Sequence, residues 1–147
     1  MSRYHLGQPS GKGLHQELLM HLPTKRSPPN AAGVLFQVAQ LLVDRGRSLL
    51  RGEVLGPRGQ LFKRSPLTAL YAASPVYLPE DFAVCPTPEG SVVLTWLVPI
   101  TGAEAAYVES HGWQTFEDSL LAEDPDLTDL SRSPLKASAD HLSAKRW

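Results

Sequence analysis

The pattern of hydrophobic and polar residues in the first third of the chain predicts a strand followed by a helix. Apolar residues over positions 14–22 alternate as in a β-strand, and Pro23 ends the run. Asn30 is a good helix N-cap, and it precedes apolar residues at helical spacing: Leu35, Val38 and Leu42. Because Gly46 suits the left-handed position that follows a helix, we expect a helix over about 31–45.

Between positions 65 and 100 the pattern predicts mainly strands. Residues 67–73 lie between Pro66 and Pro75, which leaves too little length for a stable helix, so we expect a strand. A second strand is expected over 82–85 and, after a proline-rich turn, a third over 91–98. Since the third is apolar on both faces, it has the pattern of a central strand that is covered on both sides.

Two helices are expected after this strand. Thr101 and Glu104 have the spacing of a capping box, in which each side chain bonds the backbone N–H of the other residue. The box predicts a short helix from Gly102 to about His111, which Gly112 ends. The apolar spacing that follows marks a second helix with one buried face: Trp113, Phe116 and Leu120.

Together these elements predict an α/β (α+β) fold, with a mixed β-sheet flanked by at least three helices in a single domain. A chain of 147 residues is long enough to bury one sizeable core without disulfides or metals. We expect residues 1–13 to be an irregular lead-in, residues 14–135 to form the domain, and residues 136–147 to be a flexible tail.

The net charge of −1 hides two segments of opposite sign. Residues 1–64 hold ten Lys and Arg against three Asp and Glu, whereas residues 65–135 hold one against eleven. Such asymmetry can mark a surface for nucleic acid, but two oppositely charged segments of one domain also attract each other when they pack. The basic segment lacks the interleaved aromatic residues of a stacking platform, so we expect no nucleic-acid partner.

The sequence also gives an expectation for the cellular location. Its longest apolar run, Val92–Ile100, is far shorter than a membrane-spanning helix and is interrupted by Thr95 and Pro99. The first residues lead into Gly and Pro instead of the apolar region of a secretory signal. We therefore expect a cytoplasmic protein without a membrane partner.

Residue types that perform catalysis or bind metals occur here without the spacing that their chemistry needs. The five histidines include no i, i+4 pair, and one cysteine cannot build a Cys-based zinc site. Cys85 has acidic neighbours instead of the electropositive setting of a nucleophile, so we expect a buried structural cysteine. We predict no catalytic, metal-binding or cofactor-binding residues and no enzyme. The alternative is a hydrolase or transferase whose site assembles only in three dimensions.

An ordered series of five segments resembles the suppressor-of-fused-like domain family. The match spans about residues 14–135, and its strength lies in the order of the segments: 16–23, 44–47, 91–101, 104–116 and 129–134. The first is similar to a Glu-Leu-rich strand that runs into Leu-Pro, and the last to a terminal Asp–Arg–Pro segment. The chain departs from the family at His21, where a basic residue is common, and in having no room for the second domain of the large animal members.

The resemblance implies protein binding. Animal suppressor of fused clasps a strand-like peptide of a transcription factor between two domains, whereas bacterial stand-alone members are associated with immunity against toxin domains. A lone domain of this size looks like the second kind. The resemblance therefore implies a non-catalytic immunity protein that neutralises a toxin domain in a bacterial polymorphic toxin system. The alternative interpretation is a regulatory adaptor protein that has no toxin partner.

The charge pattern gives the expected contact residues. Toxins that act on nucleic acids carry basic clefts, and opposite charge speeds the association of two proteins. The acidic segment is therefore the expected recognition surface. Its candidate partner-binding residues are Glu117, Asp118, Glu123, Asp124, Asp126 and Asp129.

Overall fold

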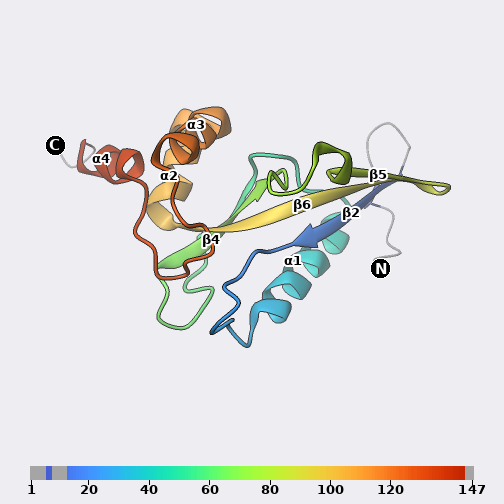
Figure 1. Ribbon diagram of the computed structural model, residues 1–147, viewed down its shortest axis with the longest axis horizontal. Helices are drawn as coiled ribbons and strands as arrows, with labels where there is room; N and C mark the ends of the chain where they lie inside the picture. The colour runs from blue at the N-terminus through green and yellow to red at the C-terminus, as the bar shows by residue number, and fades with distance from the viewer. Residues whose placement is uncertain (1–5, 8–12, 145–147) are drawn as a thin grey trace.

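A mixed six-stranded β-sheet runs through the centre of the molecule in the computed structural model, which describes residues 6–7 and 13–144 (Figure 1). The strand order is β1-β2-β6-β4-β3, and β5 pairs separately with β6. β2 runs parallel to β6, and the other pairs are antiparallel. The strands are β1 (Leu6–Gly7), β2 (Gly13–Leu19), β3 (Val54–Leu55), β4 (Leu67–Ala73), β5 (Val84–Thr87) and β6 (Gly90–Thr101).

Strand β6 is the centre of this sheet, as its apolar sequence predicts. One edge of β6 pairs with β2, and the other pairs first with β5 and then with β4. Trp96 lies opposite both Leu19 of β2 and Ala73 of β4. The expected strand over 91–98 is confirmed and continues to Thr101, where the first helix of the second half begins.

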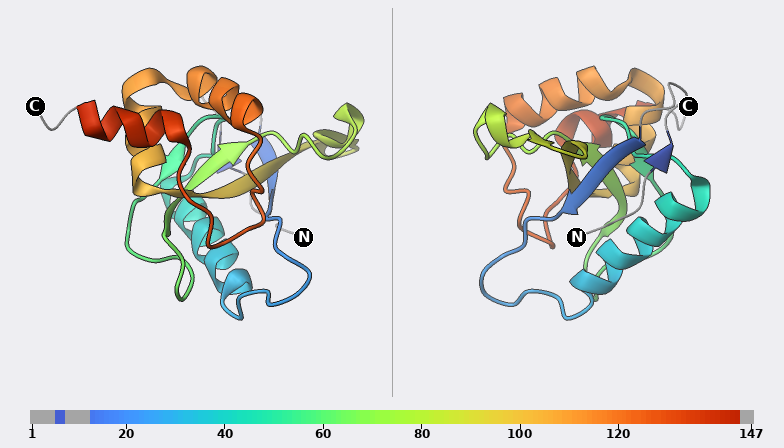
Figure 2. Two further views of the ribbon diagram at one scale, coloured as in Figure 1. Left: turned by 60° about the vertical axis from the view of Figure 1, so that its left-hand side comes forward. Right: turned by 90° about the vertical axis from the view of Figure 1, so that its right-hand side faces the viewer.

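In the described part of the chain, four α-helices cover the two faces of the sheet (Figure 2). Helix α1 lies on one face, and the other three lie on the opposite face. The mixed sheet with at least three flanking helices is thus confirmed, as are the strand over 67–73 and the helices expected from the periodicity. The helices are α1 (Ala31–Arg45), α2 (Gly102–His111), α3 (Trp113–Glu123) and α4 (Lys136–Ala144).

Successive residues of β6 supply two separate cores, because side chains alternate between the faces of a strand. Trp96 and Val98 belong to the cluster shared with α2 and α3, which contains the fully buried Phe116. Leu97 belongs to the cluster on the other face, with Val38 and other residues of α1. A strand that serves both cores needs apolar residues on both faces, which explains the run at 92–98; its one polar residue, Thr95, accepts a hydrogen bond from the Gln16 amide at 2.6 Å.

The ends of the helices follow the predicted chemistry with one exception. The Thr101 hydroxyl accepts the Glu104 N–H at 3.2 Å, and the Glu104 carboxylate accepts the Thr101 N–H at 2.8 Å. Gly46 ends α1 with φ of 65°, a conformation that favours glycine. Asn30 does not cap α1 with its side chain; instead its amide donates to the Leu61 carbonyl at 2.8 Å and ties the helix start to a distant loop.

Glu104 and Arg132 form an ion pair in the interior. The carboxylate of Glu104 is fully buried and accepts a hydrogen bond from each of the two terminal nitrogens of Arg132, with N–O distances of 2.7 and 2.9 Å. It also accepts the N–H of Leu135 at 3.0 Å, and Arg132 donates to the carbonyl of Pro99 at 3.1 Å. These bonds fasten the segment after α3 to the junction of β6 and α2.

Three expectations about boundaries need correction. The strand expected over 82–85 is present but displaced: a short 3₁₀ helix, η1 (Glu80–Phe82), precedes it, and the strand β5 covers Val84–Thr87, which pair with the start of β6. The expected strand over 14–22 ends at Leu19. Within the lead-in expected over 1–13, Leu6–Gly7 pair with β2; residues 1–5 and 8–12 lie outside the described residues.

The prediction of a flexible tail from Lys136 is wrong for residues 136–144, which form α4. The Glu123 carboxylate accepts the N–H groups of Lys136 and Ala137 at 2.8 and 3.2 Å, and so satisfies the first turn of this helix. Ser138 is fully buried, and the ring of His141 lies against that of His111 of α2 with centroids 4.6 Å apart. Contacts with α2 and α3 therefore stabilise a short segment whose residues are mainly small or polar.

The buried ion pair gives a prediction about stability. Arg132→Met leaves the Glu104 charge buried without its partner, which should lower the free energy of unfolding by about 3–5 kcal/mol in urea titrations. The double variant that combines Arg132→Met with Glu104→Gln should lose less free energy of unfolding than the sum of the losses of the two single variants, because it leaves no unpaired charge in the interior. Arg47→Met is the control: its pair with Glu53 is solvent-exposed, and the loss should stay within about 1 kcal/mol. Equal losses for Arg132→Met and Arg47→Met would contradict this role of the pair.

Candidate protein-binding surface

Two of the six predicted contact residues bind other parts of this chain. Glu117 of α3 is largely buried, and its carboxylate accepts two hydrogen bonds from Arg51 and one, at 2.9 Å, from the Tyr71 hydroxyl. Burial and this bond to Glu117 raise the pKa of Tyr71. Glu123 binds the start of α4. Both carboxylates thus hold elements of the fold together.

The other four predicted residues are exposed. Asp126 accepts hydrogen bonds from the N–H and hydroxyl of Thr128, which lower the pKa of Asp126, and Asp129 makes the equivalent pair of bonds with Ser131. Asp124 ends α3 in a left-handed conformation, with φ of 43°. The loop from Asp124 to Asp129 therefore has three exposed carboxylates, and local hydrogen bonds position those of Asp126 and Asp129.

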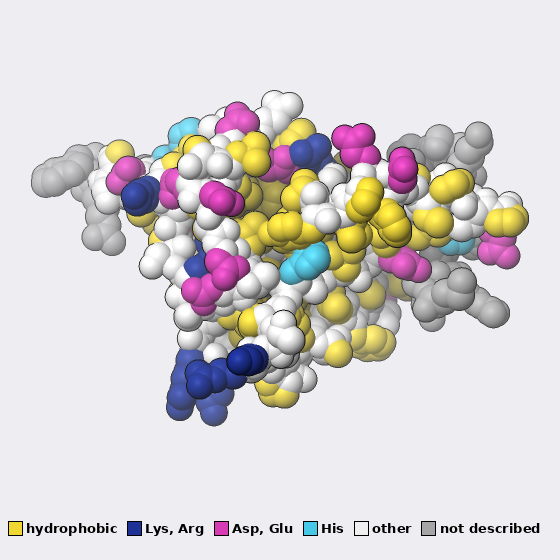
Figure 3. Space-filling view, in the orientation of Figure 1, with side chains coloured by type: hydrophobic (Ala, Val, Ile, Leu, Met, Phe, Trp, Pro, Cys, Tyr) yellow, Lys and Arg dark blue, Asp and Glu magenta, His cyan; other side chains and the backbone are white. Residues whose placement is uncertain are grey.

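A second feature, an exposed apolar segment that runs from the loop after β4 to the first residue of β5, was not expected from the sequence. Four large apolar side chains within nine residues are about half or more exposed: Val76 (71%), Tyr77 (55%), Phe82 (55%) and Val84 (47%). We call these four residues the 76–84 surface. In Figure 3, hydrophobic side chains extend from the middle of the molecule toward the β5–β6 hairpin, with carboxylates at their borders. Contiguous apolar surface of this kind marks interaction sites in soluble proteins.

Aromatic contacts hold Tyr77 in place. Its ring meets the ring of Trp96 edge-on, with centroids 4.7 Å apart, and that of His21 at 4.8 Å. His21 and Trp96 also contact each other, at 5.2 Å. Trp96 is buried in the core behind α3, so a rigid interior residue supports a half-exposed ring. Such aromatic arrangements contribute about 0.5–1.5 kcal/mol per pair beyond the area that they bury.

The acidic loop borders this aromatic group. The pKa of Tyr77 is raised by partial burial and then by the negative charges of Asp126 and Asp124. The fold thus brings Asp124 and Asp126 close enough to Tyr77 for their charges to act on it, although about 50 positions separate them from Tyr77 in the sequence. The result is an apolar centre with a rigid aromatic side chain and an acidic border.

Cys85 lies on the β5–β6 hairpin, which projects away from the helices (Figure 1). The cysteine is exposed, so the expectation of a buried structural residue is wrong. Neither face of β5 is covered, since all four of its residues are exposed. Within the described part of the chain, no three His, Cys, Asp or Glu residues gather as a metal site would require, and no helix could cross a membrane.

The family model described as Suppressor of fused protein (SUFU) matches residues 1–133. The chain belongs to the suppressor of fused family. Two segments that carry the sequence resemblance, the Glu-rich start of α2 and the Asp–Arg–Pro segment, meet in the interior through Glu104 and Arg132. None of the curated proteins compared with this sequence matches it significantly.

Solved structures of suppressor of fused proteins share this fold. A homolog from Neisseria gonorrhoeae FA 1090 aligns with a TM-score of 0.69 at 18% identity, over 82% of this chain and 63% of that one. Drosophila Suppressor of Fused aligns at 0.61 and 18% identity, over 84% of this chain and 30% of that one. A structure of the Sufu–Fu complex aligns at 0.56 and 18% identity, over 78% and 46%. This suppressor of fused chain therefore spans less than two thirds of each of these proteins.

Two neighbouring acidic residues of α3 allow a test of the structural role of Glu117. Glu117→Ala removes the partner of Arg51 and Tyr71 and should lower the free energy of unfolding by about 1–3 kcal/mol, the cost of leaving partly buried groups unsatisfied. Asp118→Ala, at the next and exposed position, should change it by less than about 0.5 kcal/mol. Thermal and urea unfolding of both variants measure the difference. Similar values would show that Glu117 has no special structural role.

Proposed function

We propose that this domain binds a protein partner without catalysis, and that it acts as a cytoplasmic immunity protein that neutralises a toxin domain in a bacterial polymorphic toxin system. The proposed contact surface is the 76–84 surface together with Asp124, Asp126 and Asp129. The observation that carries the proposal is the half-exposed ring of Tyr77, supported by Trp96 and His21 and bordered by the acidic loop.

The chemistry of this surface suits protein recognition. Tyrosine is among the residues that contribute most to binding energy, and such residues lie centrally in apolar contact areas. Because Trp96 and His21 already restrict the Tyr77 ring, a partner that covers it loses little additional side-chain entropy. The other apolar residues of the 76–84 surface would exclude water around the ring.

The acidic border defines the expected charge of the partner. Carboxylates at the rim of an interface mainly raise the rate of association with a basic surface and disfavour acidic partners. A toxin domain that acts on nucleic acid has such a basic surface. The crystal structure of a Sufu–Fu complex gives a precedent for protein binding within the family.

Capture of the partner from cell extract tests the proposal directly. Wild-type protein on beads should retain a basic partner that mass spectrometry identifies, and Tyr77→Ala should retain at least about tenfold less of it. Phe36→Ala is the matched control, because Phe36 is also an exposed aromatic residue (70%) but lies on the α1 face. Equal retention by both variants would exclude the 76–84 surface. Inhibition of the purified partner by stoichiometric domain then tests the immunity role.

Ionic strength gives a second test, aimed at the acidic loop. Asp124→Asn and Asp126→Asn together remove two charges, while asparagine tolerates the left-handed conformation at 124 and keeps an acceptor for Thr128. The association rate constant of wild type should fall steeply as salt shortens the Debye length from roughly 8 Å at physiological strength to about 3 Å at 1 M. The double variant should have a clearly shallower salt dependence.

The matched control is the double variant of Glu109→Gln and Asp140→Asn, which changes the net charge equally at exposed positions of α2 and α4. Its salt dependence should equal that of wild type. If both double variants changed the association rate equally, net charge and not the acidic loop would explain the effect.

A further inference from the structure

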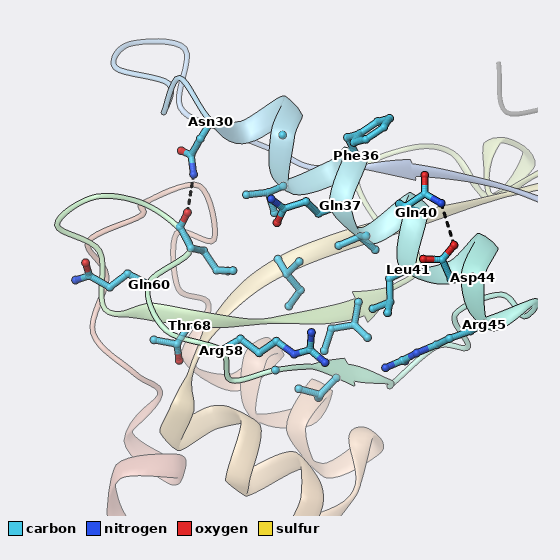
Figure 4. A pocket seen from close by; sticks show the side chains of 18 residues that line it. Asn30, Phe36, Gln37, Gln40, Leu41, Asp44, Arg45, Arg58, Gln60 and Thr68 are labelled. Atoms are coloured by element: carbon cyan, nitrogen blue, oxygen red, sulfur yellow. Dashed lines mark hydrogen bonds between the residues drawn. The ribbon is translucent and has the colours of Figure 1, made fainter.

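A groove of about 670 Å³ lies on the face of the sheet opposite Tyr77, between α1 and the chain from β3 to β4 (Figure 4). Its size is within the range of about 300–1,000 Å³ typical of small-molecule sites. One wall is α1, and the other includes the loop over 56–61. Its apolar lining includes Val34, Phe36, Val38, Leu41, Leu55 and Leu61.

Two arginines from different elements extend toward one another along this groove. Arg45 comes from the last turn of α1, and Arg58 comes from the loop after β3 (Figure 4). Within the described residues neither guanidinium forms a hydrogen bond or an ion pair. The acidic side chain that lines the groove, Asp44, instead accepts a hydrogen bond from Gln40 at 3.0 Å. Two like charges that face each other repel, and an anion between them would reverse the sign of this interaction.

A glycine on α1 leaves the groove open. Gly33 lies within the helix and lines the groove, and a Cβ at this position would have no atom within 4 Å. Glycine within a helix costs about 0.5–1 kcal/mol relative to alanine. Packing therefore gives no reason for glycine at position 33, whereas a ligand that needs the space would.

We propose that this groove binds a small organic anion with an apolar body. Its carboxylate head would lie between Arg45 and Arg58, and its hydrocarbon body would cover the apolar lining beside Gly33. Guanidinium groups match a carboxylate with two parallel hydrogen bonds, and such charge-assisted bonds are stronger than neutral ones. The site is separate from the 76–84 surface, so it does not depend on the proposed protein partner.

Three probes separate the contributions of head and body. Isothermal titration calorimetry below the micellar range should show that decanoate binds with one-to-one stoichiometry. Acetate has the head alone, and decyltrimethylammonium has the same hydrocarbon chain with a positive head. Both should bind at least about tenfold more weakly than decanoate. No binding of decanoate, or equal binding of the cationic probe, would overturn the proposal.

Matched variants locate the site. Arg45→Gln and Arg58→Gln should each weaken decanoate binding by about tenfold, the loss of one charge-assisted contact. Lys63→Gln removes the same charge at an exposed residue that does not line the groove, and its affinity should equal that of wild type. Equal weakening by all three substitutions would show a general effect of net charge and would overturn the site.

Gly33→Leu tests the groove without loss of folding. It places a side chain in the open space and replaces glycine by a better helix former, so the melting temperature should rise while decanoate binding is lost. Gly33→Ala should also melt higher, with affinity within about threefold of wild type because a methyl group fills little of the groove. Unchanged decanoate affinity in a folded Gly33→Leu protein would contradict the proposal. Partner capture by Gly33→Leu should equal that of wild type, which distinguishes failure of this site from failure of the protein-binding surface.

Discussion

The buried carboxylate of Glu104 is the constraint on which the second half of the domain depends. A charge in the interior is tolerated only when it is paired and hydrogen-bonded, and Glu104 receives N–H groups from Thr101, Arg132 and Leu135. These residues belong to the end of β6 and to the segment before α4. The hydrogen bonds that satisfy this one charge therefore hold together the central strand, helix α2 and the C-terminal segment. Loss of some of these bonds would leave a charge that is buried and incompletely paired, which is strongly destabilising.

The central strand β6 gives the two faces of the sheet different surroundings. On one face, Trp96 packs behind α3 and supports Tyr77, so the core directly positions part of the proposed protein-binding surface. On the other face, α1 packs over Leu97 but leaves a groove beside β3. Because β6 separates the two faces, the domain can carry an exposed apolar surface with an acidic border on one face and a groove with two arginines on the other, each over its own core.

Local chemistry accounts for the parts of the fold that the sequence predicts well. The helix over 31–45 ends at Gly46 because its backbone conformation favours glycine, and the capping box at Thr101 and Glu104 needs only residues three positions apart. The strand over 67–73 is bounded by prolines at 66 and 75, which restrict its length from both sides. The family resemblance adds the order of these elements, and the match to residues 1–133 agrees with it.

The sequence by itself determined the class of fold, the central strand and an acidic segment; the tertiary structure decided which side chains of that segment are available. Glu117 and Glu123 are acidic residues of the same segment as Asp124 and Asp126. In the structure, however, Glu117 binds Arg51 and Glu123 binds the start of α4. The Tyr77 ring is supported only because the fold places Trp96 of β6 against it, and Cys85 is exposed because β5 extends past the helices. The groove likewise takes Arg45 from α1 and Arg58 from the loop after β3. Periodicity and capping depend on neighbours within one or two turns, whereas these outcomes depend on contacts between residues tens of positions apart.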